Sequence, residues 1–172
     1  MRETAEDMTQ LQALLDQSIE QAGAFLRESF QMPDHSLSAA QLVTYLQGLP
    51  TVALATVTAR SEPRVAPIGA LFYRGNFYIP TVAAASRTKH ILRNSAVSLT
   101  HYASHDNDLA LIAHGQATII LSTHPDFAAL EELHRSYNNG KSVSDWGEGV
   151  FLRITPHALY TYARQPETMP AS

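Results

Sequence analysis

The residues best suited to chemistry in this sequence are the consecutive polar residues Ser86-Arg87-Thr88-Lys89. They follow a strand-like stretch and a loop of small residues, and they open a segment with helical character. The first turn of a helix presents free backbone N–H groups and a partial positive charge. Two cations and two hydroxyls added there would bind a phosphate group. The alternative is an ordinary solvated first turn capped by Ser86, because basic helix starts are common.

A second candidate is Arg64, which lies among small and apolar residues in Pro63-Arg-Val-Ala-Pro67. An arginine within an apolar strand usually has an anionic partner if its side chain points inward. Successive side chains of a strand point to opposite faces, so Arg64 could equally face solvent. The sequence leaves both possibilities open.

Two other motifs do not meet the requirements of their chemistry. Asn139-Gly140-Lys141-Ser142 is similar to the end of a P-loop. That motif requires a glycine five residues before Gly140, and the residue at this position is Arg135. His101 and His105 fall at the end of a predicted strand and in the following turn. We therefore predict no metal site.

The remaining candidate histidines, His90, His114 and His134, are assigned to packing or to the surface. Two acidic residues, Asp106 and Asp108, are the nearest carboxylates to His101 and His105, and they form no ligand pattern.

Two helices are predicted before residue 51. Apolar residues recur at steps of three and four from Met8 to Leu26, and this helix should end before Pro33. Ser38, with Gln41 three residues later, indicates a capping box that starts a second helix ending near Gly48. We expect both helices to pack on the rest of the chain rather than to bind a partner.

From Thr51 the pattern changes to β-branched, alternating residues separated by short polar turns, which predicts strands. A helix over Ser86–Asn94 and another that starts at Thr123-His-Pro-Asp126 and runs through Phe127 to Tyr137 interrupt them. Gly115 lies at a bend of the kind that marks a β-bulge. Short hairpin connections predict an antiparallel sheet that closes toward a barrel. The predicted strands are 51–58, 63–73, 76–80, 96–102, 109–121 and 150–162.

Composition indicates one globular domain, because the chain has 172 residues, of which 45% are hydrophobic and 16% charged. A net charge of -4 argues against a broad nucleic-acid surface. The chain has no cysteine, which excludes disulfides and thiolate chemistry and is compatible with a reducing cytoplasm. No signal sequence or membrane-spanning run is visible, so we expect a soluble cytoplasmic protein.

Within this domain we expect a helical extension over 1–50, a barrel over 51–164 and a flexible tail over 165–172. The extension should pack on the barrel. No Gly-x-Gly-x-x-Gly motif or βαβ alternation supports a Rossmann domain.

The chain contains, in this order, the segments LATV, an Arg-x-x-Pro-like second strand, G-x-F-Y, S-R-x-K, R-N-x-x-V-S-L, HGQATI and RITP. Together these segments resemble the split-barrel flavoprotein family that includes pyridoxamine 5'-phosphate oxidase. The resemblance covers about Leu42 to Tyr162, and it implies a mainly β fold with flanking helices, an antiparallel split β-barrel of the FMN-binding type. It also implies a homodimer with the cofactor between the subunits.

The resemblance also implies roles for individual residues. The second strand would line the isoalloxazine ring or reach the phosphate, the basic helix start would hold the phosphate, and Trp146 would pack near the flavin of the partner subunit. Thr88 separates Arg87 from Lys89 where the family often has adjacent Arg-Lys, and Ser95 replaces the usual proline. The implied cofactor residues are Arg64, Val65, Ala66, Pro67, Thr81, Ser86, Arg87, Lys89, Gln116 and Trp146.

We therefore expect an FMN-dependent oxidoreductase that acts on an unknown small molecule. The residues with which the oxidase binds pyridoxal phosphate are not evident in this sequence. One alternative is the deazaflavin F420 in place of FMN. Others are non-catalytic binding of a flavin or a tetrapyrrole, and a structural dimer with an empty groove.

Overall fold

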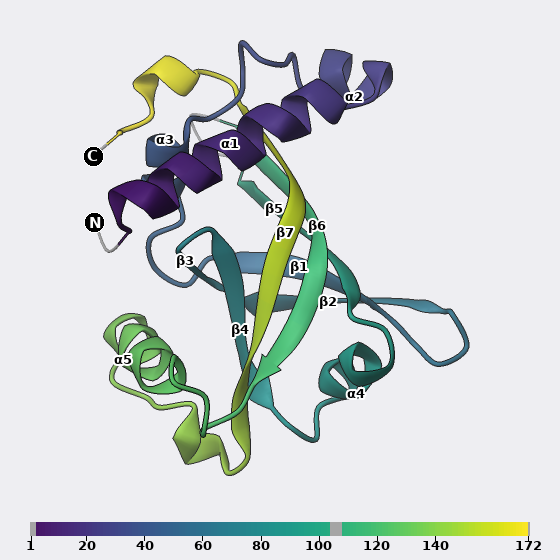
Figure 1. Cartoon of the computed structure of the whole chain (residues 1–172), viewed down its shortest axis with the longest axis vertical. Helices are drawn as coiled ribbons and strands as arrows, with labels where there is room; N and C mark the ends of the chain where they lie inside the picture. Colours follow the sequence, from purple (N-terminus) through teal and green to yellow (C-terminus); the bar gives the residue numbers. More distant parts are fainter. Residues whose placement is uncertain (1–2, 104–107, 172) are drawn as a thin grey trace.

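The computed structural model describes residues 3–103 and 108–171 (Figure 1). Within these residues the chain forms seven strands and five α-helices, with two short 3-10 turns. The strands are β1 (Thr51–Val57), β2 (Pro63–Gly69), β3 (Leu71–Tyr73), β4 (Asn76–Val82), β5 (Ala96–Ala103), β6 (Leu109–Ile120) and β7 (Gly149–Ala163). The helices are α1 (Ala5–Gln21), α2 (Ala24–Ser29), α3 (Ala39–Tyr45), α4 (Ser86–Arg93) and α5 (Phe127–Tyr137), and the turns are η1 (Ser144–Trp146) and η2 (Pro166–Thr168).

All strands belong to one antiparallel sheet in the order β2-β1-β5-β6-β7-β4-β3. The sheet curls strongly, with the long strands β6 and β7 at its centre (Figure 1). Helix α1 crosses one end of these strands, whereas α4 and α5 flank the opposite end on either side. This confirms the mainly β, split-barrel fold expected from the sequence.

The curl of the sheet follows from a single-residue connection. Strands β2 and β3 lie at opposite edges of the sheet, yet only Ala70 separates them in the chain. The two edges must therefore lie next to each other in space. The prediction of one continuous strand over 63–73 is wrong, because β2 pairs with β1 whereas β3 pairs with β4. The composition is strand-like on both sides of Ala70, so only the pairing partners reveal the break.

A β-bulge bends the central pair of strands. His114 pairs with Ala158 and Gly115 with Pro156, so His157 is the extra residue on β7. The backbones approach so closely there that a Cβ atom on Gly115 would lie 2.4 Å from the carbonyl oxygen of Thr155. The bulge predicted at Gly115 is thus confirmed, and it accentuates the local twist of the sheet.

Helix α1 packs on the barrel through both polar and apolar contacts. The single helix expected from Met8 onward is divided, because α1 ends at Gln21 and α2 begins at Ala24. The buried hydroxyl of Ser18 accepts a hydrogen bond from the Leu159 backbone N–H at 2.9 Å and donates to the Leu14 carbonyl at 2.7 Å. Helix α1 is thereby joined to β7.

Helix α3 starts as the sequence predicts. Ser38 and Gln41 form a capping box, with the Ser38 N–H donating to Gln41 Oε1 at 2.9 Å. Gln41 Nε2 also donates to the Pro166 carbonyl at 2.7 Å, and Met169 packs against the main core. These contacts connect α3 with the segment expected to be a flexible tail.

Among the described residues, no helix has the length and apolar character needed to cross a bilayer.

A second, smaller core lies beneath α5. Phe127 packs edge-on against Phe151, with their ring centroids 5.4 Å apart, and the centroid of the His134 ring lies 6.2 Å from that of Phe151. His134 is only 1% exposed, and Asn138 Nδ2 donates to its Nε2 atom at 3.3 Å. Burial lowers the pKa of His134, so its imidazole is held neutral.

We predict that Gly115→Ala destabilises the fold by about 3 kcal/mol, near the upper end of overpacking costs. The new methyl group would meet backbone atoms of Thr155 and Pro156, which cannot rotate away. Urea denaturation followed by circular dichroism measures the change. Gly23→Ala is the matched control, because a Cβ there meets nothing within 4 Å, and it should cost less than about 1 kcal/mol. Equal stability of the two variants would contradict the close approach.

We also predict that His134 makes the fold less stable in mild acid. Below its ordinary pKa of 6.5 the unfolded chain takes up a proton that the buried imidazole does not, so stability declines as the pH falls. Above that pH the contribution is constant. In His134→Gln, the loss of unfolding free energy between about pH 7.5 and about pH 5.5 should shrink by up to ~1 kcal/mol. An unchanged pH dependence in this variant would argue against a buried neutral imidazole.

Candidate functional site

An open pocket of about 440 Å³, here called the basic pocket, lies between the β1–β2 hairpin and α4. Thr56 pairs with Arg64 and Leu54 with Ala66, so these side chains share the inner face of the hairpin. Helix α4 closes the other side. The pocket is lined by Leu54, Thr56, Thr58, Arg64, Val65, Ala66, Ser86, Arg87 and His90.

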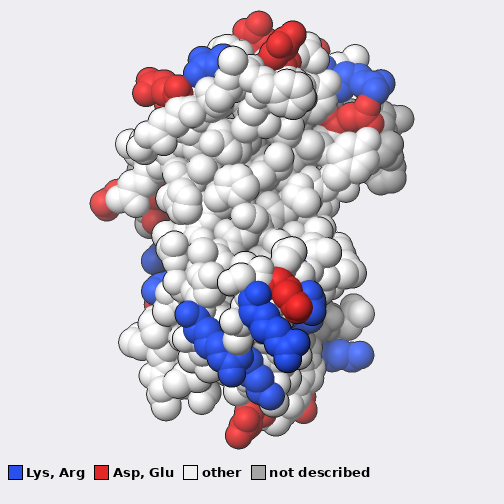
Figure 2. All heavy atoms as spheres, turned by 90° about the vertical axis from the view of Figure 1, so that its right-hand side faces the viewer, with Lys and Arg blue, Asp and Glu red and all other residues white. Residues whose placement is uncertain are grey.

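Positive charge gathers over this part of the molecule. Figure 2 shows Lys and Arg side chains clustered on the face formed by α4 and the β1–β2 hairpin. Arg64 lines the basic pocket and is paired with Glu62 at 2.7 Å, with 56% of its side chain exposed. An ion pair this exposed contributes about 1 kcal/mol or less, so the guanidinium can exchange its partner for an anionic ligand.

Helix α4 contributes its first turn to the pocket. The N-cap is Ala85 rather than Ser86, and the N-cap makes no side-chain hydrogen bond. The alternative in which Ser86 only caps a solvated first turn is therefore wrong, because Ser86 is the first helical residue and lines the basic pocket. Thr88 is buried and donates to the Val82 carbonyl at 3.0 Å, which fixes the helix against the end of β4.

Arg87 joins the basic pocket to a second one. Its Nη1 atom donates to Thr81 Oγ1 at 3.0 Å, and its side chain lines both pockets. The second pocket, here called the apolar pocket, is also open and has a volume of about 440 Å³. It is lined by Leu49, Ile68, Gly69, Pro80, Thr81, Val82, Ala85, Arg87, His134, Asn138 and Trp146.

The apolar pocket has an aromatic wall opposite α4. The rings of His134 and Trp146 meet edge-to-face, with centroids 5.6 Å apart and an interplanar angle of 86°. Because the His134 imidazole is neutral, this wall adds no positive charge. The two pockets thus differ in character, one being cationic and the other largely apolar and aromatic, and Arg87 is shared between them.

The residues singled out from the sequence divide into three groups. Arg64, Val65, Ala66, Ser86 and Arg87 meet around the basic pocket, and Thr81 and Trp146 join Arg87 at the apolar pocket. Pro67, Lys89 and Gln116 line neither of these two pockets.

Two of the last three residues lie on elements that form the pockets. Lys89 is exposed on α4 and Pro67 is exposed on β2. Gln116, on β6, accepts a hydrogen bond from the Ser95 hydroxyl at 2.5 Å.

Sequence reasoning missed several residues that line the pockets. His90 lines the basic pocket and its Nδ1 lies 2.9 Å from Thr56 Oγ1, although the sequence assigns it to packing or the surface. Its position three residues after Arg87, on the same face of α4, is the signal that could have identified it. His134 lies on the buried side of α5 and Asn138 is the C-cap of this helix. No local pattern in the sequence distinguishes them from ordinary core or capping residues.

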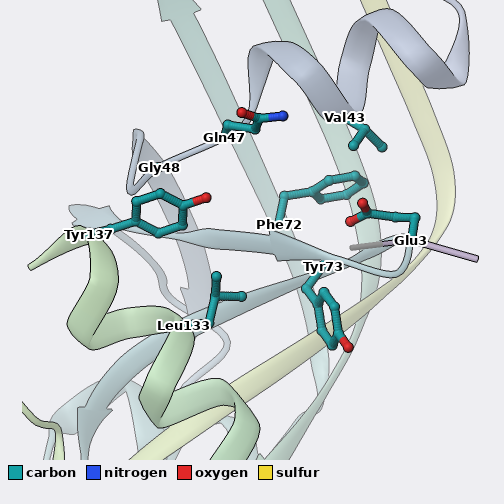
Figure 3. A pocket seen from close by; sticks show the side chains of 8 residues that line it. All are labelled: Glu3, Val43, Gln47, Gly48, Phe72, Tyr73, Leu133 and Tyr137. Carbon is teal, nitrogen blue, oxygen red and sulfur yellow. The ribbon is translucent and has the colours of Figure 1, made fainter. Parts of the chain in front are cut away.

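A third pocket, of about 120 Å³, lies between α3, β3 and α5 (Figure 3). Phe72, Tyr73 and Tyr137 surround it, and the Glu3 carboxylate lies at its edge. Its described lining residues include no lysine or arginine. This pocket is therefore a poor match for a phosphorylated ligand.

Metal ligands are not grouped in the described part of the chain, where no three His, Asp or Glu side chains lie close enough to hold an ion. His101 bridges α3 and β1, with Nε2 2.7 Å from the Tyr45 hydroxyl and Nδ1 2.7 Å from the Thr51 carbonyl oxygen. His105 and Asp106, considered with His101 above, lie outside the described residues.

Comparison with known structures gives the same fold. The chain is similar to a conserved hypothetical protein of Mycobacterium tuberculosis, with TM-score 0.66 and 18% identity over 81% of this chain and 93% of the other. It is also similar to an FAD-binding protein of Mesorhizobium loti, with TM-score 0.58 and 16% identity over 74% and 94%. An F420 reductase matches with TM-score 0.55 and 20% identity over 67% and 93%.

Among curated proteins, no sequence matches this chain. The model of the family described as pyridoxamine 5'-phosphate oxidase, in contrast, matches residues 38–163. This match includes every strand of the sheet, the basic pocket, the apolar pocket and α3 to α5. The chain therefore belongs to the pyridoxamine 5'-phosphate oxidase family of split β-barrels.

Proposed function

We propose that this protein is an FMN-dependent oxidoreductase that acts on a small molecule. The observation that carries the proposal is the position of Arg87 between a cationic pocket and an apolar, aromatic one. A ligand with a phosphate at one end and a flat ring at the other matches this pair of pockets. Phosphate binding at a helix start with flanking cations is physically favourable.

The residues of the basic pocket suit a phosphate dianion. Arg64 and Arg87 offer guanidinium donors, Ser86 and Thr58 offer hydroxyls, and His90 adds an imidazole. Lys89 is exposed on the same helix and would add attraction at longer range. Glu62 is an unfavourable neighbour, and phosphate binding would displace its carboxylate from Arg64.

The apolar pocket suits the ring. Ile68, Gly69 and Val82 provide an apolar surface, and the edge of the pocket carries Trp146. When bound there, FMN supplies the hydride or electron transfer itself. The protein supplies orientation, electrostatics and partial exclusion of water. In this arrangement a substrate need only approach the free face of the ring.

We further propose a homodimer with the cofactor at the subunit interface. Strand β2 pairs only with β1 among the described strands, and Val65 on it is 70% exposed. Trp146 is 42% exposed at the edge of the apolar pocket. A partner covering β2 would bury Val65 and complete the outer wall of the site.

F420 is the second candidate cofactor, because an F420 reductase shares this fold and a deazaflavin has a comparable flat ring and phosphate. Absorbance of the purified protein separates the candidates. A flavin band supports FMN, whereas a colourless protein that binds added F420 but not FMN supports the reductase alternative. A haem-type spectrum would instead indicate non-catalytic tetrapyrrole binding.

We predict that Arg87→Ala weakens FMN binding by about 10- to 100-fold, the effect of losing one or two charged hydrogen bonds. Riboflavin has the same ring without the phosphate, and its affinity should fall much less. Calorimetric titration of both ligands measures the two effects. Arg93→Ala is the matched control, because it removes the same charge from the last turn of the same helix, outside the pocket. Equal losses for FMN and riboflavin would contradict phosphate binding at Arg87.

We predict that the purified protein has a mass of about twice 18.9 kDa by light scattering. Val65→Asp should shift it toward the monomer and weaken FMN binding, because a buried carboxylate at the interface is strongly unfavourable. Phe25→Asp serves as control, since Phe25 is 85% exposed on α2, away from β2. An unchanged dimer in Val65→Asp would place the interface elsewhere.

A further inference from the structure

The loop that connects α5 to β7 carries Trp146, the single tryptophan of the chain, to the edge of the apolar pocket. The indole is 42% exposed and belongs to the short turn η1. An exposed loop of this kind does not hold one conformation unless specific contacts fix it. The position of Trp146 therefore depends on what binds its loop to the rest of the molecule.

One carboxylate oxygen makes most of these contacts. Glu131 Oε1, on α5, accepts a hydrogen bond from the Ser144 N–H at 3.0 Å and from the Ser144 hydroxyl at 2.5 Å. The buried Ser142 hydroxyl donates to the same oxygen. The Ser142 N–H in turn donates to Asp145 Oδ2 at 3.0 Å, which closes the turn next to Trp146.

The geometry makes Glu131 an anchor rather than a solvated surface charge. Its side chain is only 17% exposed, and Arg135 approaches its other oxygen at 3.8 Å. Burial alone would raise the pKa of Glu131, but the hydrogen bonds from Ser142 and Ser144 outweigh it and lower the pKa. Glu131 is therefore held as a carboxylate, which is the stronger hydrogen-bond acceptor.

Helix α5 supports the indole a second time. His134 lies three residues after Glu131 and contacts the Trp146 ring edge-to-face. A displaced loop would lose this contact as well as the hydrogen bonds to Glu131. The same helix thus fixes both the backbone of the loop and the aromatic ring that it carries.

We propose that Glu131 is a positioning residue that holds the Trp146 loop in the conformation that completes the apolar pocket. The contacts between Glu131 and the loop involve protein atoms alone, whereas the consequence for ring binding rests on the function proposed above. Loss of the carboxylate should free the loop and weaken binding of the ring, with no selective effect on the phosphate.

Fluorescence of the single tryptophan tests the anchor in the ligand-free protein. In Glu131→Ala, acrylamide should quench Trp146 nearly as efficiently as in the protein unfolded by guanidinium, and the fluorescence anisotropy should fall. Glu132→Ala removes the same charge from the next position of α5, where the side chain is exposed, and should behave like wild type. Glu131→Gln retains an acceptor oxygen and should restore most of the protection.

Flavin binding then tests the consequence. Glu131→Ala should lower the affinities for FMN and riboflavin by the same factor, about tenfold for the loss of a charged hydrogen-bond array. The ratio of the two affinities, which reports the phosphate contact, should stay at its wild-type value. Wild-type protein that binds no flavin would refute the proposed function, yet the quenching comparison would still decide the role of Glu131.

Two results would overturn the proposal. One is equal quenching of Trp146 in wild type, Glu131→Ala and Glu132→Ala. The other is a freed loop with unchanged riboflavin affinity, which would separate the loop from the pocket. If circular dichroism shows that Glu131→Ala does not fold, Ser144→Ala takes its place. That variant removes one of the donors to Glu131 and must increase quenching for the proposal to stand.

Discussion

The constraint on which this structure depends is the one-residue link between the two edges of its sheet. Because Ala70 alone joins β2 to β3, a seven-stranded sheet cannot lie flat. The bulge at Gly115 allows the long central strands to bend as the sheet curls. The edges approach without pairing with each other, and the barrel remains split along that line.

The pockets follow from this geometry. Curling brings the β1–β2 hairpin beside α4, and it brings the end of β4 beside the β2–β3 link. Arg87 lies where these two junctions meet, held by Thr81. A flat sheet would place Arg64 and Trp146 at remote positions, so the site exists only because the edges are forced together. The chain connectivity thus creates the two pockets, and the charged and aromatic side chains determine which ligands they can bind.

The sequence predicts those features that depend on local patterns. Local signals exist for the capping box at Ser38, the bulge at Gly115, the basic start of α4 and most of the strand positions from Thr51 onward, and the structure contains these features. The break at Ala70 has no such signal, because both neighbouring segments favour strands and only their partners differ. The contribution of His134 to a pocket could not be predicted either, since it depends on a loop that folds back over α5.

The hydrogen bonds of the Ser18 hydroxyl affect how the protein unfolds. It accepts a hydrogen bond from the backbone of β7 and donates to its own helix, all within the protein interior. Removing α1 would leave a buried N–H of the longest strand without its acceptor and uncover the apolar surface around Leu159. Helix α1 is thus part of the same folding unit as the barrel. Helix and sheet should melt in a single cooperative transition, and proteolysis should find no stable intermediate that lacks the helix.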